Sequence, residues 1–277
     1  MNIKMIKQRA REIARVNKTS LARICLIIGI ISALPSLLNA DNALIRILHF
    51  IAVVLLLAVE QGYVVAGLKA VTDREYDLSD NDAVYGVMNW IEYIPTYLTK
   101  FLVNFVCGAI FVMLILILSF GSIATVFASI DDSFGVSPLP SIMSNISSLS
   151  LVLLLIVLVA AVFVMCWINL RMFAMTYLHQ EYGMKGFDAL KESFSLMKGH
   201  CWDLFKINLS FIGWIFLCAI IEGMISELLG QNGIAGLLGA VLGAAIGAYT
   251  YQPAYITVHA LFYKEIAFKR YEEGRSE

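Results

Sequence analysis

The chain has 277 residues and a formal net charge of −1, and 60% of its residues are hydrophobic while only 15% are charged. A soluble globular domain has roughly 45–50% apolar and about 25% charged residues. The apolar residues here also stand in long blocks, and the mean hydropathy is +0.79. These values exclude soluble domains and give no reason to expect a nucleic-acid partner, so they predict a chain that folds in a lipid bilayer.

Residues 1–20 form a basic leader in which Ile3, Ile6, Ala10, Ile13 and Val16 recur at helical spacing. This spacing predicts an amphipathic cytoplasmic helix. A basic amphipathic helix can lie on anionic inner-leaflet lipids. The alternative, which we favour for its function, is that the leader's charges only orient the first span.

Six apolar segments are long enough to cross a bilayer, which takes about 20 residues. They are 21–38, 43–68, 101–128, 149–178, 207–229 and 234–262. The sequence 38–40 resembles a signal-peptidase site, but the long basic leader and Leu38 at the −3 position argue against cleavage. We therefore expect an all-α polytopic helix bundle, with a single transmembrane domain over 21–262 and a charged cytoplasmic tail over 263–277.

The basic residues predict the orientation of these spans. With the N-terminus in the cytoplasm, nineteen of the twenty Lys and Arg residues lie on the inner side and only Arg46 lies outside. Positively charged loops remain in the cytoplasm. The pattern predicts that both termini are cytoplasmic.

Two inner loops show a helical apolar pattern, at 83–94 and at 187–198, which predicts two cytoplasmic interfacial amphipathic helices. The loops also match at an offset of 106 residues, with Asp82 opposite Asp188 and Lys100 opposite Lys206. A parallel repeat of the kind found in transporters and a chance similarity both explain this match.

Charged and amide side chains inside the apolar segments suggest a polar cluster near the cytoplasmic side. Glu60 and Arg171 have matching depths in two spans, and a charge near mid-bilayer costs at least about 2.5–3.5 kcal/mol, which favours pairing. The cluster is either a functional chamber or a structural ion pair, and Arg171 could also reach the inner headgroups. The candidate residues are Glu60, Arg171, Asn104, Asn169, Asn208, Gln252 and His259. On the outer side, Glu222 and Glu227 have depths that match Arg46 and His49.

The last apolar segment contains Gly239, Gly243 and Gly247, each four residues from the next. Glycines at this spacing line one helix face and let a neighbouring helix approach closely. Pro253 follows and predicts a kink, since proline cannot donate the backbone hydrogen bond of a helix. We expect this kinked, tyrosine-rich stretch to be the best place for a ligand.

No motif predicts catalysis, a metal or a cofactor. The five cysteines are scattered without a CxxC spacing, which favours packing over a disulfide framework or a zinc site. No phosphate-binding glycine motif is present. We expect the protein not to be an enzyme.

Residues 195–200, Phe205 and 209–214, together with Pro253-Ala254-Tyr255, Thr257, Ala260 and Phe262-Tyr263, resemble a known family. It is the family of bacterial integral membrane proteins catalogued as domain of unknown function 975. The last span departs from the family pattern, in which Pro directly precedes Tyr, because Ala254 intervenes. The resemblance implies a multi-pass protein of the bacterial plasma membrane and implies no established activity.

Two hypotheses for the function remain in addition to an intramembrane enzyme, which only scattered His and Asp residues support. The first is a non-enzymatic accessory or assembly factor of the cell envelope that acts through a membrane-protein partner. The alternative is a transporter or channel for a lipid-like or small solute. The absence of catalytic motifs favours the first, and the intramembrane charges and the repeat favour the second.

Overall fold

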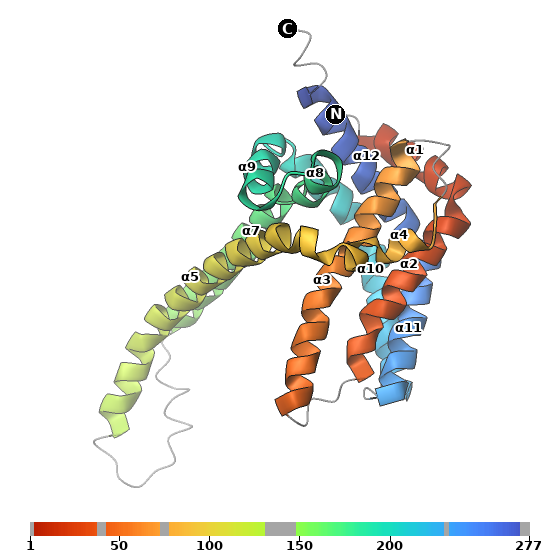
Figure 1. Cartoon of the computed structure of the whole chain (residues 1–277). Coiled ribbons are helices and arrows are strands. Elements are labelled where there is room, and N and C mark those ends of the chain that lie inside the picture. The colour runs from red at the N-terminus through yellow and green to blue at the C-terminus, as the bar shows by residue number, and fades with distance from the viewer. Residues whose placement is uncertain (1–2, 38–42, 73–77, 131–147, 230–232, 272–277) are drawn as a thin grey trace. The chain divides into compact units, whose positions relative to one another are not determined.

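The computed structural model of the chain is all-α (Figure 1). It describes residues 3–37, 43–72, 78–130, 148–229 and 233–271. Within these ranges, the side chains of 36–37, 43–55, 57, 118–130, 148–151, 154, 226, 229 and 233–235 are not described.

The chain divides into two compact units, one made of Met1–Leu98 and Arg171–Glu277 and the other of Thr99–Leu170. The first unit contains α1 (Ile3–Val16), α2 (Lys18–Ala33), the 3₁₀ turn η1 (Leu34–Leu37), α3 (Ala43–Thr72), α4 (Asn81–Met88), α8 (Met175–Tyr182), α9 (Gly186–Leu196), α10 (Cys201–Leu229), α11 (Gly233–Thr250) and α12 (Gln252–Tyr271). It also holds the first turns of α5 (Trp90–Ile130). The rest of α5 and nearly all of α7 (Ser148–Arg171) form the second unit.

The helix predicted for the leader is present as α1. Its buried residues are Ile6, Ala10 and Ala14, each four positions from the next and so on one helix face. This face packs against α12, which brings the first and last helices together. The axis turns by 89° between α1 and α2, so α1 does not simply extend α2.

The described residues contain three helices that are long and apolar enough to span a membrane: Trp90–Ile117, Leu155–Tyr182 and Cys201–Ile225. A fourth results if the bent pair of α1 and α2 counts as one span. These values correct the expected count of six spans to three or four among the described residues. The expected spans 101–128, 149–178 and 207–229 correspond to these helices.

The other three expected spans differ from one another. The first, 21–38, is too short, the last, 234–262, is interrupted, and many side chains of the second, 43–68, are not described. The helix of the first expected span, 21–38, is α2, which ends at Ala33, two residues before Pro35. With 16 residues, α2 is about 24 Å long, which is shorter than a hydrocarbon core of about 30 Å. The expected span 234–262 is divided into α11 and α12. The expected span 43–68 falls in α3, and its side chains at 43–55 lie outside the described residues.

The two expected interfacial helices have different outcomes. The one predicted at 187–198 corresponds to α9. The one predicted at 83–94 is not a single helix, because α4 ends at Met88 and α5 begins at Trp90. Between them, the side-chain amide of Asn89 donates to the carbonyl of Tyr85 at 3.0 Å and occupies a helix-end acceptor. The buried residues of α4, which are Asp82, Ala83 and Gly86, lie on the side that packs against α3.

Glycine permits the closest helix contacts of the first unit. A Cβ atom at Gly86 of α4 would lie 1.9 Å from the carbonyl oxygen of Ala58 in α3. A Cβ atom at Gly29 of α2 would lie 2.5 Å from the Cβ of Ala244 in α11. Figure 1 shows α2 and α11 side by side. The core between these helices includes the fully buried Leu21, Ile24 and Cys25.

Candidate functional site at the break between α11 and α12

The last apolar segment is interrupted where α11 ends at Thr250 and α12 begins at Gln252. Pro253 has no backbone N–H, so the Tyr249 carbonyl receives no hydrogen bond from it. The Thr250 hydroxyl donates to the carbonyl of Ile246 at 2.6 Å and competes with helical hydrogen bonding at this end of α11. The last apolar segment is therefore interrupted at Tyr251, two residues before Pro253, where the sequence predicts a kink.

A cavity of about 340 Å³ lies beside this break. Most of its wall consists of small residues, which leave space where larger side chains would fill it. The lining residues are Gly29, Ser32 and Ala33 of α2, Tyr63 of α3, Ile215, Cys218, Ala219 and Glu222 of α10, and Ala240, Gly243, Ala244, Gly247, Tyr251 and Gln252 of the α11–α12 segment.

The glycine face predicted for helix packing has two roles. Gly239, Gly243 and Gly247 are all buried, and only Gly243 and Gly247 line the cavity. A Cβ at Gly243 would lie 2.9 Å from Cγ of Glu222, so the face lets α10 approach. The same face therefore packs helices together and forms a wall of the cavity.

Two hydrogen-bond acceptors of the cavity are the carbonyl oxygen of Gln252 and the carboxylate of Glu222. The Oε1 atom of Gln252 is buried and has no hydrogen-bond partner within the described part of the chain. Glu222 forms none of the ion pairs between described residues. An unsatisfied buried acceptor costs about 1–3 kcal/mol. A ligand that donates hydrogen bonds would remove this cost, and a positive charge would complement Glu222.

The predicted partners Glu60 and Arg171 are not joined by an ion pair among the described residues. Glu60 is exposed on α3 and lies within electrostatic range of the hydroxyl groups of Tyr63, Tyr97 and Tyr255. The guanidinium carbon of Arg171 lies 5.5 Å from the ring centre of Phe194, so the cation contacts an aromatic face instead of a carboxylate.

We expect the stability losses of Glu60→Gln and Arg171→Met to add in the double variant to within about 0.5 kcal/mol, as for residues that do not touch. Denaturation of the detergent-solubilised full-length chain, with all three variants compared with the unsubstituted protein, measures this sum. A double variant that is clearly more stable than the sum would show that the two side chains are coupled.

The other predicted polar residues form separate pairs. In the first unit, the Nε2 atom of His259 lies 2.8 Å from Oδ1 of Asn208, and its Nδ1 atom lies 2.7 Å from the carbonyl oxygen of Tyr255. In the second unit, the Nδ2 atom of Asn169 donates to Oδ1 of Asn104 at 3.0 Å. Gln252 lies at the cavity instead.

A buried polar network that the sequence patterns did not predict connects α3, the start of α5 and α8. Gln61 is fully buried and donates to Oε1 of Gln180 at 3.3 Å. Its own Oε1 accepts from the Tyr97 hydroxyl at 3.2 Å, and the Tyr93 hydroxyl donates to Gln180 at 2.5 Å. The spacing of Tyr93 and Tyr97, four residues apart on one helix face, was the available signal. These groups satisfy one another, which favours a structural role.

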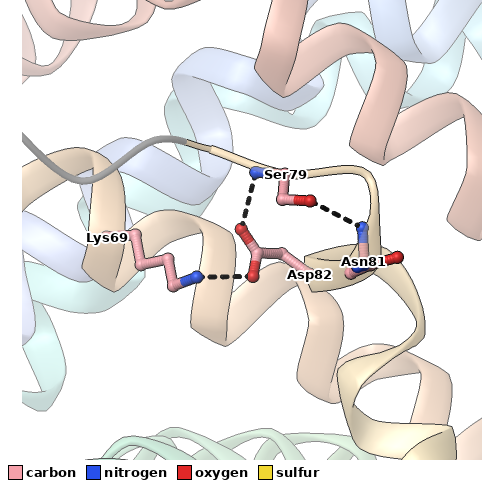
Figure 2. Close-up of polar contacts among 4 residues, drawn as sticks. All are labelled: Lys69, Ser79, Asn81 and Asp82. Atoms are coloured by element: carbon pink, nitrogen blue, oxygen red, sulfur yellow. Dashed lines mark hydrogen bonds and ion pairs between the residues drawn. The ribbon is translucent and has the colours of Figure 1, made fainter.

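Figure 2 shows a second buried polar contact, between α3 and α4. The Nζ atom of Lys69 lies 2.6 Å from Oδ1 of Asp82, and the backbone N–H of Ser79 donates to Oδ2 at 3.1 Å. The Asp82 side chain is only 5% exposed. This ion pair fixes the start of α4 on α3, and it lies apart from the cavity residues.

The described residues contain no group of three or more His, Cys, Asp and Glu side chains that could hold a metal ion. Burial lowers the pKa of His200, and the nearby Asp203 acts in the opposite direction. The lowered pKa favours the neutral imidazole at pH 7.

Comparison with known protein families identifies the family of the chain. The family model described as "Protein of unknown function (DUF975)" matches residues 1–270. The chain belongs to this family. The match includes α1, the cavity residues and nearly all of α12, so the resemblance seen in the sequence is confirmed over almost the full length. No curated protein and no solved structure matches the chain.

Proposed function

We propose that this chain binds a small solute within its membrane helices and acts as a transporter or channel for it, in the plasma membrane of a bacterium. The cavity at the break between α11 and α12 is the observation that carries this proposal. Transporters bind their substrates at discontinuous membrane helices, and ionisable residues within spans mark solute pathways. The α11–α12 break is such a discontinuity, and Glu222 is an ionisable residue within the candidate span Cys201–Ile225.

The chemistry of the cavity favours a small organic cation. Glu222 offers a carboxylate and Gln252 an unsatisfied carbonyl oxygen. Tyr63 and Tyr251 add aromatic faces that attract cations. The volume of about 340 Å³ lies at the lower end of the usual range of roughly 300–1,000 Å³ for small-molecule sites.

A non-enzymatic accessory or assembly factor is the second candidate, and the second unit favours it. None of the most apolar stretch of Trp90–Ile117 is buried within the protein. The exposed Asn169 presents its hydrogen-bonded amide on the facing helix α7. Polar side chains of this kind hydrogen-bond across helices in membranes, so a partner helix could dock here.

Both candidate functions assume the same orientation of the chain in the membrane. The basic residues of the leader and of the inner loops place both termini in the cytoplasm under the positive-inside rule. In this orientation Glu222 lies toward the outer end of α10, and the Lys69–Asp82 pair lies on the inner side.

Ligand-dependent unfolding of the full-length chain in detergent tests the solute site. We expect methylammonium, a cation that donates hydrogen bonds, to raise the melting temperature, while glucose and acetate leave it unchanged, because a ligand that binds only the folded state stabilises it by about 2.7 kcal/mol at 100 times Kd. Ala240→Leu should abolish this shift because its side chain enters the cavity. Glu222→Gln should weaken binding about tenfold, corresponding to about 1.4 kcal/mol.

The matched control is Ala245→Leu, the same substitution on α11 at a residue that does not line the cavity. It should retain the ligand-dependent shift. Equal loss in Ala240→Leu and Ala245→Leu would contradict the site. Absence of any shift, with a stable heteromeric complex after mild purification, would favour the accessory factor.

A further inference from the structure

A second, smaller cavity of about 40 Å³ lies where α1 crosses α10 and α12. Its walls are Lys7, Ala10 and Arg11 of α1, Ser210, Phe211 and Trp214 of α10, and Ala254 and Val258 of α12. Two cations therefore adjoin one side of it, and aromatic rings form the other. This cavity is separate from the solute cavity, and nothing below depends on the proposed function.

The two cations have no carboxylate partner within the described part of the chain. Lys7 and Arg11 are four residues apart on α1, a spacing at which like charges repel. Acidic residues of the same three helices are engaged elsewhere: Glu12 accepts from Gln8, Asp203 pairs with Lys206 and Glu265 pairs with Lys269. An anion bound between Lys7 and Arg11 would replace this repulsion with attraction.

The size and the donor geometry of the cavity suit a phosphate group. A volume of about 40 Å³ holds roughly three water-sized atoms, which is enough space for the two free oxygens of a phosphodiester. The planar guanidinium of Arg11 can donate two parallel hydrogen bonds to such a group, and the Lys7 ammonium adds a compact charge.

The surface beyond the cavity is apolar, which favours a lipid over a free anion. Trp214 is 50% exposed, and Leu217, about one turn further along α10, is 47% exposed. Tryptophan is enriched where membrane meets water. A phospholipid can therefore place its phosphate at the cations and its acyl chains along α10.

We propose that Lys7 and Arg11 bind the phosphate of an anionic phospholipid of the inner leaflet, whose acyl chains lie along α10 beyond Trp214. The leader then carries a specific lipid site in addition to the charges that orient the first span. Since α1 packs on α12, the bound lipid also joins α1, α10 and α12 at one point.

Lipid titration of the full-length chain in a neutral detergent, followed by native mass spectrometry, tests this site. We expect dioctanoylphosphatidylglycerol to bind about tenfold more tightly than dioctanoylphosphatidylcholine, since each cation near an anionic headgroup contributes attraction. The double variant Lys7→Gln/Arg11→Gln should remove this preference. The charge-retaining variant Lys7→Arg/Arg11→Lys should keep most of it.

The matched control is Lys4→Gln/Arg15→Gln, which removes the same charge from α1 at residues that do not line the cavity. It should leave the lipid preference within about twofold, as expected for screened, non-contacting charges. Equal losses in the two Gln double variants would overturn the site in favour of diffuse attraction. Competition by inorganic phosphate as effective as that by the lipid would overturn the assignment to a phospholipid.

Discussion

Gly86→Ala is expected to lower the free energy of unfolding of the detergent-solubilised chain by about 3 kcal/mol, the upper end of the range for overpacked cores. The new Cβ would lie 1.9 Å from the carbonyl oxygen of Ala58 and 2.7 Å from Cβ of Gln61. Neither α3 backbone nor a buried Gln61 can move aside easily, so α4 must shift away from α3. Chemical denaturation, compared with the unsubstituted protein, measures the loss.

Gly213→Ala is the matched control for this prediction. Gly213 is also helical, but a Cβ there would meet nothing within 4 Å. The substitution should be neutral or raise stability by up to about 1 kcal/mol, the difference in helix propensity between alanine and glycine. If Gly86→Ala were as stable as Gly213→Ala, then α4 would not pack on α3 as the structure describes.

Asp82→Ala is expected to cost about 3 kcal/mol of unfolding free energy, the lower end of the range for removing one partner of a buried ion pair. Lys69 loses its carboxylate, and the backbone N–H of Ser79 loses its acceptor. The value lies at the lower end because the Lys69 side chain is 33% exposed and keeps some contact with water. Thermal and chemical unfolding of the variant in detergent check it.

Asp80→Ala provides the comparison at a neighbouring carboxylate. Asp80 pairs with Arg23 at 3.6 Å, but both side chains are about half exposed, at 52% and 53%. Exposed pairs of this kind contribute about 0–1 kcal/mol. The double variant Lys69→Met/Asp82→Leu should recover part of the stability that Asp82→Ala loses, because it leaves no unpaired buried charge. A cost for Asp82→Ala no greater than that for Asp80→Ala would contradict the buried pair.

The two contacts that these variants probe have one consequence for the cavity. Gly86 and Asp82 hold α4 on α3, and α3 contributes Tyr63 to the cavity wall. α2 and α11 complete that wall through the close approach of Gly29 to Ala244. The shape of the cavity wall therefore depends on close helix packing at small residues.

Local patterns in the sequence determine the all-α class, the amphipathic leader, the candidate membrane-spanning helices and the interruption of the last apolar segment near Pro253. Each depends on neighbouring residues alone. Apolar residues four apart make α1 amphipathic wherever it lies, and Pro253 lacks a backbone donor in every environment. The family resemblance, which rests on the motifs of α9, α10 and α12, is confirmed over residues 1–270.

Which polar residues meet depends on how the helices pack in three dimensions. Equal depth in two spans suggested that Glu60 pairs with Arg171, but depth does not fix the direction in which a side chain points around its helix. The helices instead bring Arg171 to Phe194, and Asn208 to His259. The cavity was equally hidden in the sequence, since it arises where small residues of α2, α10 and α11 face one another. Such a space depends on distances between segments more than 200 residues apart, such as those of Gly29 and Gly247, and no local pattern encodes those distances.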